Sequence, residues 1–404
     1  MRIAVIFHRF GPYHCARLDA ASRYCDITGI ETAAETREST WSPVHDASGY
    51  SRLTLFPAGG TGAMPAEHMS AHVHRALQSC SPDVVAIPGW SDNAAIAALR
   101  SCAETGIPAI LMSESTTLDK PRVRWREWIK QRIVDLYSTA LVGGQRHIDY
   151  LVDLGMPRDR IFTGYDVVDN DYFAWKANEV RGQKEEVRRK YGLPENYFLA
   201  SARFIEKKNL FTLIRGYAGY RHAAANSELR TSNSEPWVLV LLGDGPLKSD
   251  LCRLIADLRL DSSVLLPGFK QYDELPFYYG LANAFVHAST TEQWGLVVNE
   301  AVASALPVIV SNRCGCVPEL VQDNGFTFDP TNKRDLASRL FEIASLSEEK
   351  REGLGQASRR IAANFGSESF GQGLEHAGRM AIELPPKKLG ALKRALLFGA
   401  MRYR

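Results

Sequence analysis

Short apolar runs alternate with longer amphipathic stretches along the first 170 residues of the chain. The apolar runs occupy residues 2–7, 53–57, 83–88, 109–113, 140–143 and 160–164. This alternation is typical of βαβ units and therefore of a parallel sheet. Several runs end in Gly, Ser or Thr, and ligands of such sheets bind where the strands end.

The second half of the chain repeats this alternation. From residue 197 onward, apolar runs such as WVLVLLGDG, AFVHAST and PVIVS return. Helical periodicity covers residues 209–222, 247–258 and 332–345. Between the halves, residues 171–196 are rich in charge and include a Gly and a Pro. We interpret this stretch as a linker with room for a short helix.

These patterns predict an α/β fold with two Rossmann-like, doubly wound domains. The N-terminal domain is expected at residues 1–170, the linker at 171–196 and the C-terminal domain at 197–366. Residues 367–404 are expected to form a helix and a basic tail that cross back to the N-terminal domain. The small polar residues at 223–236 indicate a surface insertion.

Composition narrows the class of protein. With 404 residues, 45% apolar and 23% charged, the chain is globular rather than disordered. Its net charge of +2 argues against a protein that coats nucleic acid. The seven cysteines are scattered and form no C-x-x-C pair, so we expect neither a zinc site nor a disulfide framework. No signal peptide or spanning segment is evident, which favours a cytoplasmic protein.

The segment from residue 284 to residue 320 carries the most specific chemistry. A predicted strand opens there into a polar loop, and a helix is expected from about Gly295. Backbone N–H groups at the start of a helix favour an anion such as a diphosphate. Glu292 lies in the loop and Glu300 in the second helical turn. Carboxylates beside an anion site are well placed only if they meet hydroxyl groups, such as those of a sugar joined to the phosphate.

Glu292-x7-Glu300, followed by Ala301, resembles the signature of retaining family-4 glycosyltransferases (glycosyl transferases group 1) of the GT-B fold. Residues 202–210, ARFIEKKNL, resemble that family's Gly-Arg-x4-Lys-Gly segment. Further matches are Gly243-Asp244-Gly245-Pro246-Leu247, Pro267-Gly268-Phe269, and Cys314-Gly315-Cys316-Val317-Pro318-Glu319 in place of Gly-Gly-x-Pro-Glu.

The resemblance implies a retaining enzyme that moves a sugar from a UDP- or GDP-sugar to a hydroxyl of a saccharide or lipid-linked acceptor, in envelope or exopolysaccharide synthesis. It implies that Arg203 and Lys208 neutralise the leaving diphosphate, that Glu292 binds the donor sugar and that Glu300 binds the ribose. With those two cations present, no metal or other cofactor is expected. The other donor-binding residues that it implies are Gly243, Gly245, Gly268, Phe269, Gly295, Leu296 and Val297.

The N-terminal domain offers candidates for the acceptor side. Gly11 and His14 follow the first strand, where a glycine lets a ligand approach the backbone. An ordinary surface or structural role for His14 stays open. Members of the resembled family often have a His at the end of a later strand; Glu114 stands near that place and is a candidate substitute.

Rival functions remain open at this stage. A GT-B sugar-nucleotide epimerase or hydrolase would share the donor site but need no acceptor. A nicotinamide-dependent oxidoreductase is disfavoured, because the first strand is followed by His8-Arg9-Phe10-Gly11-Pro12 instead of G-x-G-x-x-G. A catalytically inactive carbohydrate-binding module is disfavoured by the intact set of charged residues.

Two basic segments suggest contact with an anionic membrane surface. Residues 120–132 hold six basic residues against one Glu, beside an apolar ridge of Trp125, Ile129 and Ile133. The tail, residues 387–404, adds six more basic residues and no acidic one. Either segment has the composition of a peripheral membrane contact. Packing of the ridge on the N-terminal sheet is the open alternative.

Overall fold

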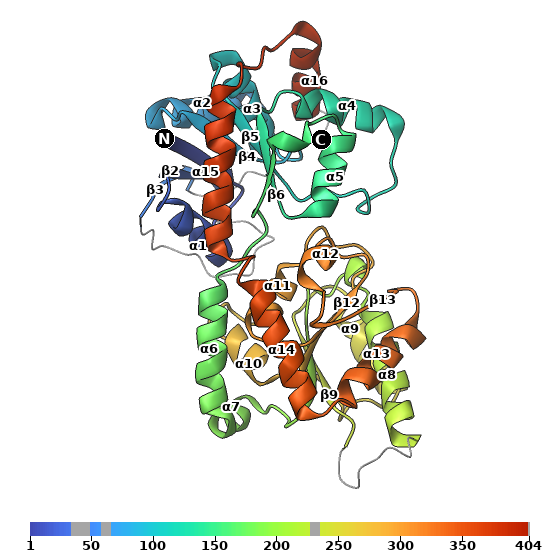
Figure 1. Ribbon diagram of the computed structural model, residues 1–404. Helices are drawn as coiled ribbons and strands as arrows, with labels where there is room; N and C mark the ends of the chain where they lie inside the picture. Colours follow the sequence, from blue (N-terminus) through green and yellow to red (C-terminus); the bar gives the residue numbers. More distant parts are fainter. Residues whose placement is uncertain (34–48, 58–65, 227–234, 403–404) are drawn as a thin grey trace. The chain divides into compact units, whose positions relative to one another are not determined.

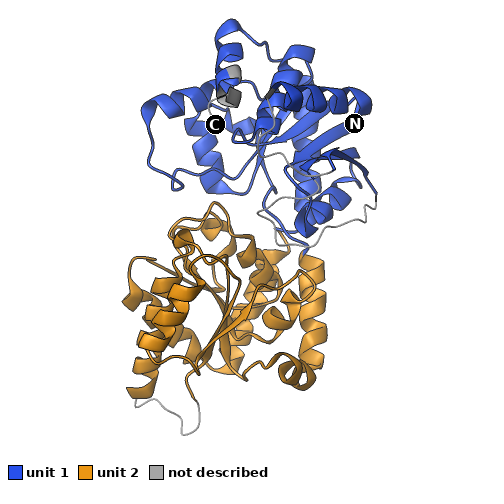
Figure 2. Ribbon diagram, turned by 180° about the vertical axis from the view of Figure 1, so that it is seen from behind, with its two compact units in different colours: residues 1–169, 365–404 blue, residues 170–364 orange. Residues whose placement is uncertain are grey.

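The computed structural model describes residues 1–33, 49–57, 66–226 and 235–402. The chain divides into two compact units, residues 1–169 with 365–404, and residues 170–364 (Figure 2). Most of the expected insertion at 223–236 lies outside the described residues. Among the described helices, none combines the length and apolar character that crossing a bilayer requires.

The first unit is built on a parallel sheet. Its described strands follow the order β3-β2-β1-β4-β5-β6-β7. Their bounds are β1 (Arg2–Phe7), β2 (Asp26–Ala33), β3 (Ser51–Phe56), β4 (Val84–Pro88), β5 (Ala109–Ser113), β6 (Thr139–Val142) and β7 (Ile161–Thr163). The apolar runs in the sequence predict all of these except β2. Val5 packs on one face of the sheet and Ile6 on the other, as strand alternation requires.

Helices cover both faces of this sheet. On the face that carries Ile6, helices α2, α3, α4 and α5 and Leu397 of α16 contribute to the core. On the other face, α15 packs against α1, β6 and β7 (Figure 1). Residues 365–404 therefore belong to the first unit. The helices are α1 (Pro12–Ala21), α2 (Ala66–Cys80), α3 (Asn93–Thr105), α4 (Arg124–Val134), α5 (Gln145–Asp153), η2 (Arg158–Arg160), α15 (Ser367–Glu383) and α16 (Ala391–Arg402).

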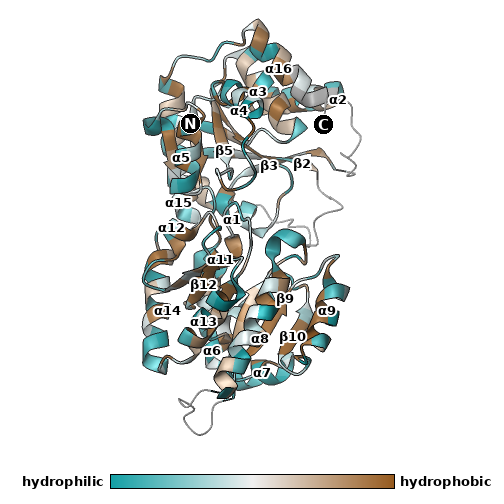
Figure 3. Cartoon of the chain, turned by 90° about the vertical axis from the view of Figure 1, so that its right-hand side faces the viewer, coloured by the Kyte–Doolittle hydropathy of each residue, from teal (hydrophilic) through white to brown (hydrophobic). Residues whose placement is uncertain are grey.

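The second unit holds another parallel sheet. Its described strands follow the order β10-β9-β8-β11-β12-β13. They are β8 (Tyr197–Ser201), β9 (Val238–Leu242), β10 (Val264–Gly268), β11 (Ala284–His287), β12 (Val308–Ser311) and β13 (Gly325–Phe328). Figure 3 shows the strands β9, β10 and β12 as apolar, with polar colours on the helices around them. For β9 and β12 this is the pattern of strands buried on both faces, whereas the edge strand β10 is only partly buried.

The second unit begins earlier in the chain than the sequence analysis predicts. The expected linker, residues 171–196, is largely helical and belongs to this unit, because α6 packs against α10 and α11. Phe173 and Ala177 of α6 are fully buried there. The helices are α6 (Asn170–Gly182), α7 (Lys184–Tyr191), η3 (Glu206–Lys208), α8 (Leu210–Asn226), α9 (Lys248–Asp257), α10 (Leu275–Leu281), α11 (Leu296–Ala303), α12 (Val317–Leu320), α13 (Lys333–Ala344) and α14 (Glu348–Ala362).

Candidate active site

The predicted donor residues gather at the carboxyl edge of the second unit's sheet. They lie in the loops that follow β8, β9, β10 and β11, and in α11. Because parallel strands end at the same edge, segments up to about a hundred residues apart in the sequence meet there. The residues predicted to bind the donor therefore lie together at one edge of the second unit's sheet.

Two glycines let the loops after β8 and β9 pack against each other. Gly243 has a φ of +127°, and a side chain added to it would meet the Ala202 carbonyl oxygen at 1.8 Å. Gly245 has a φ of +153°, and an added Cβ would lie 2.8 Å from the backbone of Phe204. The Phe204 N–H donates to the Asp244 carbonyl at 2.8 Å. Glycine is therefore required at both positions by the close approach and by the left-handed backbone.

A charged cluster connects the loops after β8 and β11. The ammonium of Lys208 pairs with the Oε2 of Glu292. That oxygen also lies 3.2 Å from the Nε2 of His287, and it accepts a hydrogen bond from the Ser289 hydroxyl at 3.2 Å. Lys208 and Glu292 are only 14% and 11% exposed, and His287 is buried. The cluster is therefore largely shielded from solvent, where charge interactions are stronger than in water.

Electrostatics fix the protonation states of this cluster. Burial opposes ionisation of Glu292, but the hydrogen bond from His287 and the charge of Lys208 outweigh it and hold the pKa of Glu292 well below its ordinary value. Burial, assisted by the nearby lysine charges, lowers the pKa of His287. At neutral pH the cluster is an ammonium, a carboxylate and a neutral imidazole.

Glu300 lies within α11 (Leu296–Ala303), about one turn after its start. It is 1% exposed. Burial, together with the charge of Glu300 and a hydrogen bond with it, raises the pKa of Tyr279 well above its ordinary value. Gly295 caps α11 with a φ of +109°, so the N–H groups of Leu296 and Val297 begin the helix without a side-chain cap. The uncapped start of α11 and a buried carboxylate thus lie in neighbouring turns.

The loop that carries Glu292 is fixed on both sides. The Thr290 N–H donates to the Lys207 carbonyl at 2.9 Å, and the Gly315 N–H donates to the Glu292 carbonyl at 3.0 Å. Cys314 and Cys316, which flank Gly315, are fully buried. The two cysteines of this segment therefore serve as packing residues.

The remaining donor candidates surround this cluster. Arg203 is exposed and, among the described residues, has no hydrogen bond or ion pair. The Gly243 N–H donates to the Gly268 carbonyl at 3.0 Å, and Gly268 has a φ of +83°. Phe269 follows it, half-buried. Arg203 is thus a cation at this edge that no carboxylate of the described residues pairs with.

The acceptor candidates lie at the carboxyl edge of the first unit's sheet. The Gly11 N–H donates to the Nδ1 of His14 at 3.1 Å, so this imidazole caps α1. Burial and the nearby Arg17 charge lower the pKa of His14 to about 3. Gly11 has an ordinary φ of −131°. The structure therefore gives His14 a structural task and does not require glycine at position 11 for the backbone conformation.

Glu114, the third acceptor candidate, has a carboxyl neighbour. Asp166 follows β7 and is 1% exposed. Burial and the charge of Glu114 raise the pKa of Asp166 well above its ordinary value, against the charge of Arg17, and a hydrogen bond with Glu114 raises it further. Arg17 is itself 2% exposed and donates to the Val167 carbonyl at 3.0 Å. Asp166 and Arg17 are thus buried beside the half-buried Glu114.

Sequence reasoning missed four polar residues of these two edges: His287, Ser289, Tyr279 and Asp166. For three of them a signal exists, because His287 ends β11, Ser289 lies two residues later and Asp166 follows β7, where functional groups of parallel sheets gather. Tyr279 gives no such signal, because it lies within α10 and reaches the site only through tertiary packing.

Residues 183–361 match the family described as glycosyl transferases group 1. The matched segment lies within the second unit. A curated relative, alpha-monoglucosyldiacylglycerol synthase of Acholeplasma laidlawii, is 30% identical over 138 residues, which are 34% of this chain and 32% of the relative. The chain aligns with 14% to 34% of the length of the curated relatives that it matches.

Solved structures extend the likeness to both units. A glycosyltransferase from Rickettsia africae matches with a TM-score of 0.72 at 15% identity, covering 94% of this chain and 98% of that one. Anabaena Alr3699/HepE, solved in complex with UDP and glucose, matches with a TM-score of 0.68 at 15% identity, covering 93% and 98%. The predicted GT-B fold with two Rossmann-like units is confirmed.

Proposed function

We propose that this chain is a retaining glycosyltransferase that moves a sugar from a nucleotide-sugar donor to a hydroxyl of a saccharide or lipid-linked acceptor. The observation that carries the proposal is the buried cluster of Lys208, Glu292 and His287 at the carboxyl edge of the second sheet. The family match, the A. laidlawii lipid glucosyltransferase and the UDP complex of the Anabaena protein support it.

In this proposal the second unit binds the donor. The diphosphate takes the N-terminus of α11 together with Lys208 and Arg203, whose exposed guanidinium has no competing anion among the described residues. Lys208 then holds two anions, its Glu292 partner and the phosphate. Glu292 accepts hydrogen bonds from donor-sugar hydroxyls, and Glu300 accepts them from the ribose. Gly268 and Phe269 contact the base, and Gly243 and Gly245 keep the loops in place.

The reaction follows from the charges. As the glycosidic bond to the diphosphate breaks, negative charge grows on the leaving oxygen, and Arg203, Lys208 and the helix dipole stabilise it. The acceptor hydroxyl attacks from the same face and gives its proton to the leaving phosphate, so the anomeric configuration is retained. The acceptor is assigned to the first unit, with Gly11, His14 and Glu114 as its candidate contacts.

Two measurements test this function. A thermal-shift panel of UDP, GDP, ADP and their sugars should show stabilisation by one nucleotide family, since a ligand at a hundred times its Kd stabilises by about 2.7 kcal/mol. Product analysis with and without candidate acceptors then separates transfer from epimerisation or hydrolysis. Failure of every nucleotide to shift the melting curve would contradict the donor site.

We infer that the acceptor side contacts an anionic membrane through α4. Trp125 and Trp128 are 60% and 40% exposed, and Arg124 and Arg126 are exposed beside them. Exposed tryptophans among basic residues are typical of an interfacial helix. The expected apolar ridge divides: Ile133 is buried and Ile129 packs on the core, while Trp125 faces solvent.

Part of the basic charge is neutralised within the unit. Lys130 pairs with Glu127 at 2.8 Å and donates to the Tyr150 hydroxyl, which also accepts from Arg122. In the tail, Lys393 and Lys387 pair with Asp135, and Leu397 is buried in the core. These residues anchor the segments to the unit. The membrane contact is therefore assigned to residues 123–128 rather than to the whole basic set.

Co-sedimentation with vesicles of anionic phospholipid at low salt tests this contact. Replacing Trp125 and Trp128 with Ser and Arg124 and Arg126 with Gln should release the protein, since each basic residue contributes about 1 kcal/mol at such a surface. Trp175→Ser, at an equally exposed tryptophan of α6, is the matched control. Undiminished binding by the four-residue variant would contradict the assignment.

A further inference from the structure

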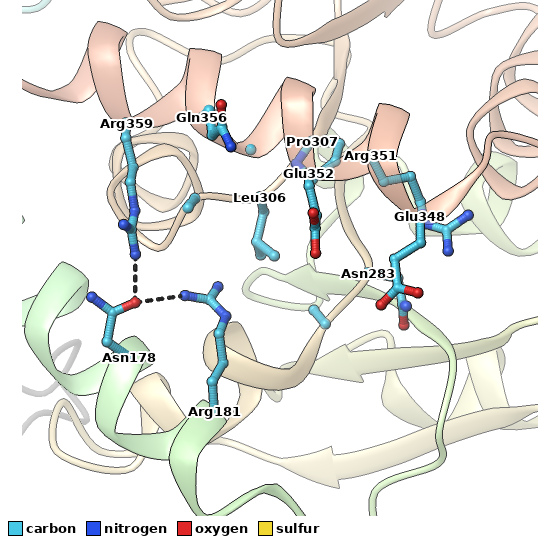
Figure 4. Close-up of a pocket in the computed structure, with 13 residues that line it drawn as sticks. Asn178, Arg181, Asn283, Leu306, Pro307, Glu348, Arg351, Glu352, Gln356 and Arg359 are labelled. Atoms are coloured by element: carbon cyan, nitrogen blue, oxygen red, sulfur yellow. Dashed lines mark hydrogen bonds between the residues drawn. The ribbon is translucent and has the colours of Figure 1, made fainter.

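A cavity of about 440 Å³ opens in the second unit, away from the donor cluster (Figure 4). Asn283 and Pro307 line it, and each directly precedes a strand, β11 and β12. The cavity therefore lies at the amino edge of the sheet, whereas the donor residues lie at the carboxyl edge. Helices α6 and α14 supply most of its polar side chains.

One end of this cavity is cationic. Arg181 of α6 and Arg359 of α14 both donate to the Oδ1 of Asn178 (Figure 4). Arg181 also donates to the carbonyl of Ser304, at the end of α11. Among the described residues, no carboxylate forms an ion pair with either guanidinium. Burial and the charge of Arg359 lower the pKa of Arg181, as expected for two like charges close together.

Hydrogen-bond acceptors line the other end. Glu348 and Glu352 of α14 lie on the same helix face as Arg359, spaced by one and then two turns, and Asn283 lies opposite Glu348 (Figure 4). Neither glutamate has an ion-pair partner among the described residues. Arg351, which also lines the cavity, donates to the Leu346 carbonyl and stacks 5.2 Å from the Trp237 ring centre.

These contacts define what would fit. Two guanidiniums that share one neutral oxygen leave donors for an oxyanion, and arginine forks match phosphate geometry. Carboxylates at the far end accept hydrogen bonds from hydroxyls. The volume falls within the range of about 300–1,000 Å³ typical of small-molecule sites, and it exceeds what a phosphate alone requires.

We propose that this cavity binds a small sugar phosphate, with its phosphate on Arg181 and Arg359 and its hydroxyls on Glu348, Glu352 and Asn283. The site is separate from the donor site, because the two lie at opposite ends of the same strands. The proposal rests on the charges and volume of the cavity alone. It stands whether or not the chain transfers sugars.

Calorimetric titration at low ionic strength tests the site, with excess UDP present to occupy the donor edge. The probes are glucose 6-phosphate, inorganic phosphate and glucose. Glucose 6-phosphate should bind, inorganic phosphate should bind more weakly, and glucose should not bind. Arg359→Gln should lower the affinity for both phosphates about tenfold or more, because it removes a charge-assisted contact. Glu352→Gln should weaken glucose 6-phosphate only.

Arg360→Gln is the matched control. This neighbour on α14 is exposed, pairs with Asp323 and does not line the cavity. It should leave both affinities unchanged, and equal melting temperatures should show that all three variants are folded. The proposal is overturned if glucose 6-phosphate does not bind the unaltered protein at millimolar concentration. It is equally overturned if Arg359→Gln binds as well as the unaltered protein, or if Arg360→Gln weakens binding as much.

Discussion

The carboxyl edges of the two sheets both bury carboxylates, yet they compensate them in opposite ways. At the second sheet, Glu292 has a cation, Lys208, and a hydrogen-bonding imidazole, so it stays ionised. At the first sheet, Asp166 has another carboxyl, Glu114, as its neighbour, with Arg17 as the cation that opposes the repulsion. The same architecture therefore produces one edge with separated fixed charges and one that favours a bound proton.

The difference indicates which edge is prepared for an anion. Burying a charge is costly unless it is paired, so the second edge keeps its cation by holding a carboxylate next to it. In the proposed function, a diphosphate would be bound by Lys208 and the start of α11. At the first edge, a protonated carboxyl can both donate and accept hydrogen bonds, which suits neutral hydroxyl groups.

The largest effect should come from removing the cation of the donor edge. Lys208→Ala should lower kcat roughly a hundredfold or more, because preorganised charge stabilisation is usually the largest catalytic contribution. Arg203→Ala should act in the same direction. Donor consumption and product formation measure it. Lys207→Ala is the control, since Lys207 is exposed on the same turn and its side chain forms no hydrogen bond or ion pair with the described residues. Full turnover by folded Lys208→Ala would refute the donor assignment.

A stability comparison of two glycines should sharpen the contrast between the edges. Gly243→Ala places a methyl group against the Ala202 carbonyl at a positive φ, and we expect a loss of about 1–3 kcal/mol or more. Gly11→Ala is the matched substitution at the other edge, where an added Cβ meets only the His14 Nδ1, at 3.7 Å. Thermal unfolding of both variants decides it. Equal melting temperatures would show that the loops of the donor edge are not held by this contact.

Much of the fold could be predicted from the sequence because strands buried on both faces are continuous apolar runs. Strand β2 was not predicted, because its sequence, DITGIETA, interleaves polar residues with apolar ones. Its Glu31 is 1% exposed yet paired with Arg52 at 2.7 Å and hydrogen bonded to Thr54, both on the neighbouring β3. A buried polar residue whose partner lies on another strand cannot be recognised by local periodicity.

The site shows the same limit. The positions of Lys208, Glu292 and Glu300 follow from their motif spacing, but their pairing does not, because Lys208 and Glu292 are 84 residues apart. The predicted linker failed for a related reason. Most of its charged residues are exposed, whereas Phe173, Ala177 and Val180 are buried on α6, which packs against α10 and α11, and the charges obscured this apolar stripe. The pairing of the two charges and the burial of one face of α6 both depend on tertiary packing, which composition does not reveal.

A smaller effect should separate nucleotide binding from sugar binding at the donor edge. Glu300→Gln keeps the shape but removes the charge, so UDP affinity should fall about tenfold, in line with hydrogen bonds to a charged group. Glu292→Gln should reduce turnover more than UDP affinity. Calorimetry with UDP, set beside initial rates, gives both values. Unchanged UDP affinity in Glu300→Gln would remove Glu300 from the nucleotide site.

The smallest effect concerns the pH dependence of stability, and it should have opposite signs at the two edges. The folded-state pKa of Glu292 lies below its ordinary 4.5, so its contribution is present above about pH 4.5 and is lost as the pH falls. Glu292→Gln should therefore be less stable than the unaltered protein at neutral pH, and this difference should disappear in acid.

The pKa of Asp166 lies above its ordinary 3.8, so its contribution to stability is present below that value and is lost as the pH rises through the folded-state pKa. Asp166→Asn should match the unaltered protein in acid and exceed it at neutral pH. Melting temperatures of the three proteins across the acid to neutral range measure both trends, and parallel curves for Asp166→Asn and the unaltered protein would contradict the raised pKa of Asp166.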